Sequence, residues 1–423
     1  LTAVYLDGHE VKKSASVPPI KIADFPIMVK SDRCHTSSCS REALKNLEED
    51  PKDIGGYFII GGQEYVIDLL ENIRYNMLHI HRKMEVNEMV RGEFLSQQGG
   101  SYEHSMQTRV RHMVNGAITI EINSTKFQKV KLPFYLLYRL FGMASDEAAV
   151  ETIVFDVNGT DSITDYIKQN LEKAFLFKDD KDRFYTLRDT TQQADIIRSM
   201  SELMVRYLSD RRSARASENT INYLLETLMT TLDQSILPHL GDKPENRMEK
   251  LRFLGLMIYK MFLVELGVLM PTDRDNYASK RVHGAGASLA KSYKTRFNKF
   301  ISTPALKAFR RLVRNNSFDE ISDKMIIDTF KSALITSELD RELERAITAG
   351  QQATKTAKQT HLNRVSSQII ERKNYLHFMS TLRTVTTHNP KGASKQTERA
   401  DVMRRVQPSY VGYICITRSV DTG

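Results

Sequence analysis

Two glycine pairs near the start of the chain, at positions 55–56 and 61–62, bracket the apolar run YFII at 57–60. A short run of β-branched and aromatic residues between glycines is typical of a strand. A second apolar run follows the later pair, and a glycine pair between two such runs predicts a hairpin turn. The fold must therefore include antiparallel strands here, with Gln63-Glu64 at the tip of the hairpin.

Strand and helix patterns are mixed along the rest of the chain. Residues 1–74 look strand-rich, with an apolar run at 25–29, and the alternation at 116–122 predicts a half-buried strand. Residues 132–142 predict a helix with Pro133 at its first position. Further helices are expected at 197–208, 220–237 and 250–269, with the LPHLG run at 237–241 separating the last two. A chain of 423 residues has room for two or three cores, so we predict a multi-domain α+β protein.

Positive charge is concentrated in one stretch. Between Asn276 and Phe318 there is no Asp or Glu. The stretch holds ten basic residues: Lys280, Arg281, Lys291, Lys294, Arg296, Lys299, Lys307, Arg310, Arg311 and Arg314. A solvated helix face is the usual explanation of a charge run, but such faces normally mix signs because opposite charges one turn apart stabilise a helix. A stretch of one sign favours a nearby polyanion, of which nucleic acid is the commonest.

Helical periodicity continues through this basic stretch. The apolar residues Phe297, Phe300 and Ile301 fall on one stripe. Thr303 followed by Pro304 is typical of an N-cap and first helical position, so we expect a new helix to begin there. The spacing of the aromatic residues favours a core role over a role as base-stacking platforms.

Few residues suggest catalysis or metal binding. The three cysteines, Cys34, Cys39 and Cys415, are too few for a disulfide framework and suggest a reducing compartment; no second ligand pair completes a zinc site. The acidic pair in DRD at 273–275 is better explained by helix capping than by a metal. No phosphate-binding or hydrolase motif is present. Residues 251–270 are apolar but contain charged side chains, which favours a buried helix over a membrane span.

A second basic region lies near the end of the chain. Residues 386–407 are rich in Gly, Ser, Thr, Asn and Lys and predict an exposed loop. The loop carries Lys391, Lys395, Arg399, Arg404 and Arg405 against Glu398 and Asp401. The adjacent arginines at 404 and 405 suit phosphate binding, and the alternative is a surface ion pair with Asp401.

Six segments in order resemble one family. They are PIMV at 26–29, GGYFIIGGQEYVI at 55–67, LPHL at 237–240, DRDNYASKR at 273–281, STLR at 380–383 and QPSYVGYIC at 407–415. Together they resemble the second-largest subunit of multisubunit DNA-directed RNA polymerases, the counterpart of the bacterial β subunit, in its eukaryotic-like branch. Six collinear matches across most of the chain are highly specific.

Two departures from the family pattern stand out. Residues 421–423, DTG, replace the family's usual ETPEG and are similar to versions carried by nucleocytoplasmic large DNA viruses. Thr384 replaces the second of two arginines that cellular relatives have, which puts that paired contact in doubt. Because the chain starts at Leu1 and stops at Gly423 directly after a strand-like run, we expect it to be part of a longer protein.

The resemblance implies a division into named regions. Residues 1–74 resemble the later part of the protrusion, 75–281 a mostly helical lobe, 282–345 the basic return to the protrusion, and 346–423 the fork with its loops and helices. On this assignment the hairpin at 53–67 is a scaffold where protrusion and lobe join, without a catalytic role.

The resemblance also implies a function. The chain would hold the DNA template and the RNA–DNA hybrid, in contact with the largest subunit and other polymerase subunits and without a membrane. The catalytic metal site of this family lies on the largest subunit, so we expect no catalytic or metal-binding residue and no cofactor here, with Mg²⁺ in the assembled polymerase. The location would be intracellular: the host cytoplasm, viral factory or virion for a viral version, and the nucleus for a cellular one.

The expected nucleic-acid contacts are Arg383, Arg404, Arg405, Lys391, Lys395, Lys291, Lys294, Arg310 and Arg311. Two other functions remain open from the residues alone. One is a free-standing basic DNA-binding protein, which would bind duplex DNA tightly without other subunits. The other is an interaction scaffold that binds an acidic protein.

Overall fold

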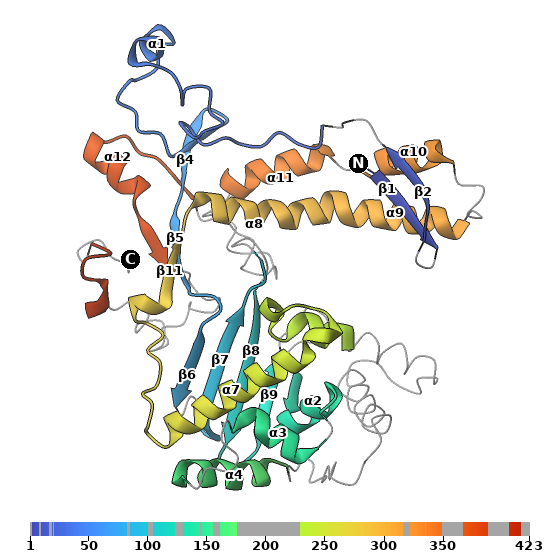
Figure 1. Ribbon diagram of the computed structural model, residues 1–423. Helices are drawn as coiled ribbons and strands as arrows, with labels where there is room; N and C mark the ends of the chain where they lie inside the picture. The colour runs from blue at the N-terminus through green and yellow to red at the C-terminus, as the bar shows by residue number, and fades with distance from the viewer. Residues whose placement is uncertain are drawn as a thin grey trace. The chain divides into compact units, whose positions relative to one another are not determined.

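The computed structural model describes residues 2–7, 10–16, 19, 21–82, 85–99, 105–122, 130–143, 145–154, 161–175, 229–315, 322–334, 336–348, 367–387 and 406–415. The chain forms two compact units, each of which is considered by itself (Figure 1). Unit 1 comprises Leu1–Asn72 and Arg281–Gly423, and unit 2 comprises Ile73–Lys280. Both helices and sheets are present, which confirms the prediction of a multi-domain α+β protein.

Unit 2 is built on a five-stranded antiparallel meander with the order β10-β9-β8-β7-β6. The strands are β6 (Leu78–Arg82), β7 (Glu88–Ser96), β8 (Met106–Met113), β9 (Ile118–Ile122) and β10 (Val130–Pro133). The strand predicted at 116–122 is therefore confirmed as β9. Because this sheet spans residues 78–133, the mostly helical character expected for 75–281 does not hold for that part, whereas the elements described between residues 134 and 279 are helices.

Side chains alternate between the two faces of this sheet. One face is apolar and includes Val90, Phe94 and Val110, all buried. The long helix α7 (Arg247–Glu265) packs on that face and contributes Leu254 and Met261 to the same core (Figure 1). This helix confirms the one predicted at 250–269, although it begins and ends a few residues earlier.

Shorter helices complete the core of unit 2. They are α2 (Phe134–Leu140), α3 (Asp146–Ile153) and α4 (Ser162–Phe175). Helix α2 begins one residue after Pro133, which ends strand β10 and occupies the N-cap instead of the predicted first helical position. The helix predicted at 197–208 lies outside the described residues, and the one predicted at 220–237 is described only from residue 229. The separating run is confirmed as the short 3₁₀ helix η2 (Pro238–Leu240).

The predicted hairpin is present in unit 1. Strands β3 (Phe58–Ile60) and β4 (Gln63–Ile67) pair antiparallel across Gly61 and Gly62, whose φ angles are 57° and 77°. Two positive φ angles are what a type I′ hairpin turn requires, and glycine adopts them without strain. A third strand, β12 (Ser367–Ile369), adds to β4 from far along the chain. By contrast, the apolar run at 25–29 forms no strand.

Other strands of unit 1 form small sheets. Strand β5 (Leu69–Ile73) lies between β11 (Lys280–His283) and β13 (Val385–Thr387), with β13 parallel to β5. A two-stranded ribbon is formed by β1 (Thr2–Asp7) and β2 (Glu10–Ser16). Because β13 occupies 385–387, the loop predicted at 386–407 begins later than expected, and most of it lies outside the described residues.

The basic stretch forms one long helical run. Helix α8 (Ala285–Phe297) passes through the π-helical segment η5 (Asn298–Ser302) directly into α9 (Thr303–Asn315) (Figure 1). Helix α9 does begin at Thr303, but the predicted N-cap role of Thr303 is wrong, because Thr303 has helical angles and its N–H donates to the carbonyl of Asn298. Pro304 cannot donate a backbone hydrogen bond, and the wider π turn accommodates it without breaking the helix.

Two further helices pack against this run. Helix α10 (Asp323–Ala333) lies against α9, where the rings of Phe309 and Phe330 stack 6.1 Å apart. Helix α11 (Thr336–Thr348) contributes Leu339 and Leu343 to a cluster with Phe300 and Ile301. The core role predicted for the aromatic residues of the basic stretch is confirmed for Phe300. The remaining helices of unit 1 are α1 (Arg41–Asn46), α12 (Tyr375–Leu382) and the 3₁₀ helix η8 (Pro408–Tyr410).

Candidate nucleic-acid interface

Helix α9 carries a one-signed basic face. Lys307, Arg310, Arg311 and Arg314 are spaced i, i+3, i+4 and i+7, so at about 100° per residue they fall within one side of the helix. All four are exposed. The opposite side holds the buried Ala305 and the half-buried pair Phe309 and Leu312, which pack toward α10. Burial of this apolar stripe fixes the rotation of α9 and turns the four cations outward; we call these four residues the α9 basic face.

The α9 basic face has no acidic partner in the part of the chain that the structure describes. No ion pair involves Lys307, Arg310, Arg311 or Arg314 among those residues. The neighbouring helix α10 carries exposed charges of both signs, with Asp323 and Asp328 near Lys324 and Lys331. A cluster of uncompensated like charges repels itself and favours binding of a polyanion.

Helix α8 divides its basic residues between two faces. Lys291 and Lys294 are one turn apart on the side away from the buried Leu289 and Ser292, and both are half-buried. Burial lowers the pKa of Lys291, which makes an anionic partner more valuable to it. These two predicted contacts therefore lie on the same helical run as Arg310 and Arg311.

Arg296 has a different role from its neighbours in the stretch. It donates to the side chain of Ser292, and its Nε lies 3.8 Å from a carboxylate oxygen of Glu342 on α11. Burial lowers the pKa of Arg296, and the charge of Glu342 partly opposes that effect. Arg296 thus joins α8 to α11 and is not available to a ligand. The basic residues of this stretch therefore do not all have the same role.

Arg383 lies apart from this helical run in unit 1. It is the C-cap of α12, its N–H donates to the carbonyl of Ser380, and its side chain is exposed. No ion pair engages it among the described residues. The other four predicted contacts, Lys391, Lys395, Arg404 and Arg405, lie outside the described residues.

Sequence reasoning left two members of the α9 basic face out of the predicted contacts. Lys307 and Arg314 are seven residues apart, and the i, i+7 spacing was the available signal that they share a side with Arg310. Recognising them required the rotation of α9, which is set by its packing on α10.

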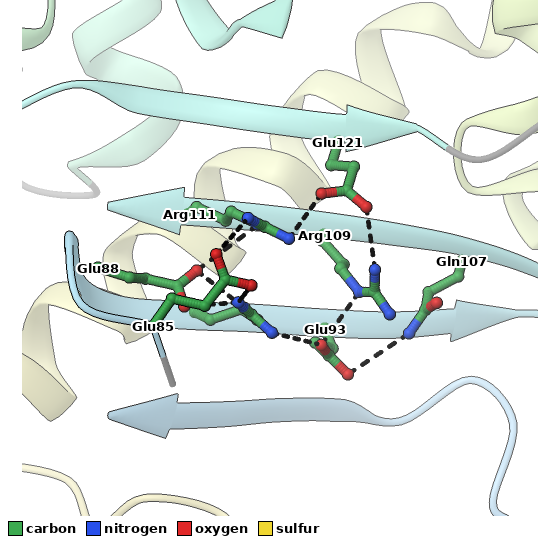
Figure 2. Close-up of polar contacts among 8 residues, drawn as sticks. Glu85, Glu88, Glu93, Gln107, Arg109, Arg111 and Glu121 are labelled. Carbon is green, nitrogen blue, oxygen red and sulfur yellow. Dashed lines mark hydrogen bonds and ion pairs between the residues drawn. The ribbon is translucent and has the colours of Figure 1, made fainter. Parts of the chain in front are cut away.

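Unit 2 holds a second concentration of charge, but its members neutralise one another (Figure 2). On the sheet face opposite α7, three arginines and four glutamates interlock. The ion pairs include Arg91 with Glu88 at 2.6 Å, Arg111 with Glu121 at 2.7 Å, and Arg109 with Glu93 at 3.0 Å and Glu121 at 2.9 Å, while Glu85 contacts both Arg91 and Arg111. Because charges paired in this way largely cancel one another's field, this cluster offers little attraction to a charged ligand.

Nothing in the described residues suggests chemistry of its own. No group of three His, Cys, Asp or Glu side chains among them could hold a metal ion. Asp273 accepts a hydrogen bond from the backbone N–H of Asp275 at 2.9 Å, which supports a structural role for Asp273, but the cap of the 3₁₀ helix η4 (Tyr277–Ser279) is the neighbouring Asn276. Within the same described part, no helix combines the length and apolar composition needed to cross a membrane.

Comparison with known proteins identifies the family. A family model described as RNA polymerase beta subunit matches residues 4–337. The chain belongs to the RNA polymerase beta-subunit family. A second family model, described as RNA polymerase Rpb2, domain 3, matches residues 368–422 of this beta-subunit family member.

Individual relatives agree with the assignment to the beta-subunit family. The DNA-directed RNA polymerase subunit Rpo2N of Methanothermobacter thermautotrophicus (strain Winter) is 25% identical over 397 residues, which cover 94% of this chain and 71% of that protein. The DNA-directed RNA polymerase II subunit RPB2 of Schizosaccharomyces pombe is 26% identical over 402 residues, which cover 93% of this chain and 30% of that protein. Rpo2N of Halobacterium salinarum (strain ATCC 29341 / DSM 671 / R1) is 26% identical over 386 residues, with shares of 89% and 63%.

These matches confirm the predicted resemblance to the second-largest subunit of RNA polymerase. They do not favour a free-standing DNA-binding protein or an interaction scaffold. The resemblance of residues 421–423 to viral versions stays a prediction, as do the location in the cell and the names given to the regions.

Proposed function

We propose that this chain holds nucleic acid inside a DNA-directed RNA polymerase, with the α9 basic face against phosphates of the template or of the RNA–DNA hybrid. The observation that carries the proposal is the set of four exposed cations on one side of α9, without ion pairs in the described part of the chain. Membership of the beta-subunit family supplies the nucleic-acid context, because the relatives are named as subunits of DNA-directed RNA polymerases.

The dimensions of the α9 basic face suit a phosphate backbone. Lys307 and Arg314 are seven residues apart, which is about 10 Å along a helix. Successive nucleotides of one strand rise by roughly 3.4 Å, so the face spans about three of them. Three of the four residues are arginines, which can pair with phosphate through two parallel N–H donors. Contacts of this kind set the position of nucleic acid without reading its sequence.

The residues of this chain would bind and orient the nucleic acid, while bond formation would take place at the catalytic site of the largest subunit. In the assembled enzyme, Mg²⁺ ions held by the largest subunit would stabilise the attacking and leaving oxygens of nucleotidyl transfer. The α9 basic face, Lys291, Lys294 and Arg383 would keep the template and hybrid in place from one addition to the next. Arg404, Arg405, Lys391 and Lys395 belong to the same proposal on the basis of sequence alone.

Neutralising two positions of the α9 basic face tests the proposal. In the assembled polymerase, Lys307→Gln with Arg314→Gln should weaken retention of an RNA–DNA scaffold and flatten its salt dependence. Each lost phosphate contact should reduce the slope of log affinity against log salt by about 0.9, so the double variant should lose up to about 1.8. The measurement is scaffold dissociation over a range of salt concentrations.

Helix α10 offers the matched control. Lys324→Gln with Lys331→Gln removes the same two charges, also seven residues apart and exposed, from the helix packed against α9. These lysines lie near Asp323 and Asp328, so the salt slope should stay close to that of the unmodified polymerase. Equal slopes for both double variants would refute a specific role of the α9 basic face.

A separate measurement addresses the partners. The chain should co-purify with the largest polymerase subunit and, in isolation, should bind duplex DNA only weakly at physiological salt. Tight duplex binding by the isolated chain, together with failure to co-purify, would instead support the free-standing DNA-binding protein.

A further inference from the structure

The acidic residue at the hairpin tip has one dominant partner. Glu64 on β4 accepts two hydrogen bonds from Arg372, at 2.7 Å to Nε and 2.9 Å to Nη2. Asp53 lies 3.5 Å from the same guanidinium. The hydrogen bonds that Arg372 donates to Glu64 are the main reason that the pKa of Arg372 is raised, with Asp53 adding to the effect. Two-point pairing of this type fixes the orientation of the guanidinium as well as its position.

Two aromatic rings enclose the same guanidinium. Its central carbon lies 4.5 Å from the ring centre of Phe378 and 5.4 Å from that of Tyr57, and the two rings meet edge to face. The Tyr57 hydroxyl donates to Asp53 at 2.5 Å, which completes the enclosure. We call Glu64, Asp53, Tyr57 and Phe378 the Arg372 cage.

The Arg372 cage lies at one end of α12, and Arg383 lies at the other. After Arg372 the chain reaches Asn374, whose side chain accepts the N–H of His377 at 2.7 Å and caps the start of α12. Phe378, in the middle of α12, is buried against Tyr57 and Val66 of the hairpin segment. The helix ends at Leu382 with Arg383 as its C-cap, and β13 then pairs with β5. The position of Arg383 therefore depends on how α12 is seated on the hairpin.

We propose that Arg372 is a positioning residue for nucleic-acid binding: by locking α12 to the hairpin tip at Glu64, it sets the place from which Arg383 reaches a phosphate. The inference rests on the proposed function, which supplies nucleic acid as the ligand. It gives the hairpin tip an indirect role in binding, through Arg383, without a direct contact between the tip and nucleic acid. The alternative is an ordinary surface ion pair with no effect on binding, since the Arg372 side chain is 45% exposed.

The two explanations predict different changes in nucleic-acid affinity for the variant Glu64→Gln. Glu64→Gln removes a negative charge from unit 1 and removes the charged partner of Arg372. If Arg372 were only a surface cation, losing Glu64 should leave affinity for a polyanion unchanged or raise it. If Arg372 positions Arg383, losing Glu64 should lower that affinity although a negative charge has been removed.

The test is a double-variant cycle in the assembled polymerase bound to an RNA–DNA scaffold. Arg383→Ala should lower affinity by about tenfold, as expected for one lost charge-assisted contact, and reduce the salt slope by about 0.9. Glu64→Gln should produce a loss in the same direction. The double variant Glu64→Gln with Arg383→Ala should be little worse than Arg383→Ala alone, because both changes remove one contact.

Glu371→Gln is the matched control. Glu371 precedes Arg372, is 62% exposed and pairs only with the neighbouring Lys373 among the ion pairs of the described residues. Removing its charge should not lower affinity or salt slope. Arg372→Lys keeps the charge but loses the two-point geometry, so it should behave like Glu64→Gln, with a retained melting temperature showing that the fold survives.

The outcomes separate this inference from the proposed function. If Arg383→Ala weakens binding while Glu64→Gln and Arg372→Lys leave it unchanged or strengthen it, the positioning role is wrong and the contact by Arg383 stands. If Arg383→Ala has no effect, the proposed contact itself fails. If all three weaken binding but Glu64→Gln and Arg383→Ala add fully, the cage acts independently of Arg383 and the inference is overturned.

Discussion

Glu265, the last residue of α7, joins three elements of unit 2. One carboxylate oxygen lies 2.8 Å from Nδ1 of His112 on β8, and the other accepts the hydroxyl of Tyr166 on α4, also at 2.8 Å. Burial raises the pKa of Glu265, but the hydrogen bonds from His112 and Tyr166, together with nearby positive charge that includes Arg82, outweigh it and hold the pKa below its ordinary 4.5. Burial, together with the carboxylate of Glu265, raises the pKa of Tyr166 to about 12. The ionised form of Glu265 therefore stabilises the fold.

Because the pKa of Glu265 is lower in the folded state, its contribution to the free energy of unfolding should decrease at acidic pH. The stabilisation from Glu265 should be complete above its ordinary pKa of 4.5 and should be lost as the pH falls through the lower folded value. At pH 7, Glu265→Gln should reduce the free energy of unfolding by about 1–3 kcal/mol, because His112 and Tyr166 lose a charged partner. Urea unfolding at several pH values should show this difference shrinking below pH 4.5.

Glu249→Gln, on the exposed side of the same helix, serves as the control for this prediction. It should change stability by less than about 0.5 kcal/mol at every pH. A difference between wild type and Glu265→Gln that persists unchanged into the acid range would show that the carboxylate charge is not what stabilises the junction.

Individual side chains show how far sequence alone could go. Lys291 and Arg296 belong to the same acid-free stretch and look equivalent in the sequence, but the structure places the Arg296 guanidinium beside Glu342. The acid comes from α11, beyond the stretch, so local pattern could not identify it. Arg372 was missed for the same reason, because its partner Glu64 comes from the opposite end of the chain.

At the scale of elements, close packing of α7 on α3 depends on one glycine. A Cβ on Gly255 would lie 2.3 Å from the carbonyl oxygen of Thr152, a backbone atom that cannot move away independently. Gly255→Ala should therefore destabilise the chain by about 1–3 kcal/mol, even though alanine favours helix by roughly 1 kcal/mol. Urea unfolding of the variant measures the net effect.

Gly286 in α8 is the matched comparison, because a Cβ there would meet no atom within 4 Å and its φ is not positive. Gly286→Ala should stabilise by about 0.5–1 kcal/mol through propensity alone. Two Gly→Ala substitutions should thus have opposite effects on the free energy of unfolding. Stabilisation by Gly255→Ala would contradict the packing of α7 on α3.

Helices and strands with a clear local sequence pattern could be predicted, whereas those that depend on contacts with residues far along the chain could not. The hairpin at 53–67 follows from turn chemistry, and α7 follows from its length and apolar content. The N-cap predicted at Thr303 was wrong because the π-helical segment η5 joins α8 directly to α9, without a break before Pro304. Strands β7 and β8 gave no clear strand signal because one of their faces carries arginine and glutamate, whose pairing becomes apparent only across the sheet (Figure 2).

At the scale of the whole molecule, the six collinear motifs predicted the family that the comparisons confirm. Several of these motifs are structural. The hairpin binds β12, the DRDNYASKR segment supplies caps and β11, and STLR ends α12. The α9 basic face, in contrast, lies between motifs and is defined by its charge and by the packing of α9 on α10. Motifs thus identified the scaffold, whereas physical reasoning about charge located the candidate interface.

Photo-crosslinking can show whether α9 lies against nucleic acid in the assembled polymerase. Replacing Arg311 by the photo-crosslinking residue benzoylphenylalanine in the assembled polymerase, bound to a labelled RNA–DNA scaffold, should transfer label to this chain on irradiation. The same replacement of Lys331 on α10 should transfer little. Label transfer at position 331 but not at position 311 would contradict the account, because it would place the nucleic acid away from the α9 basic face.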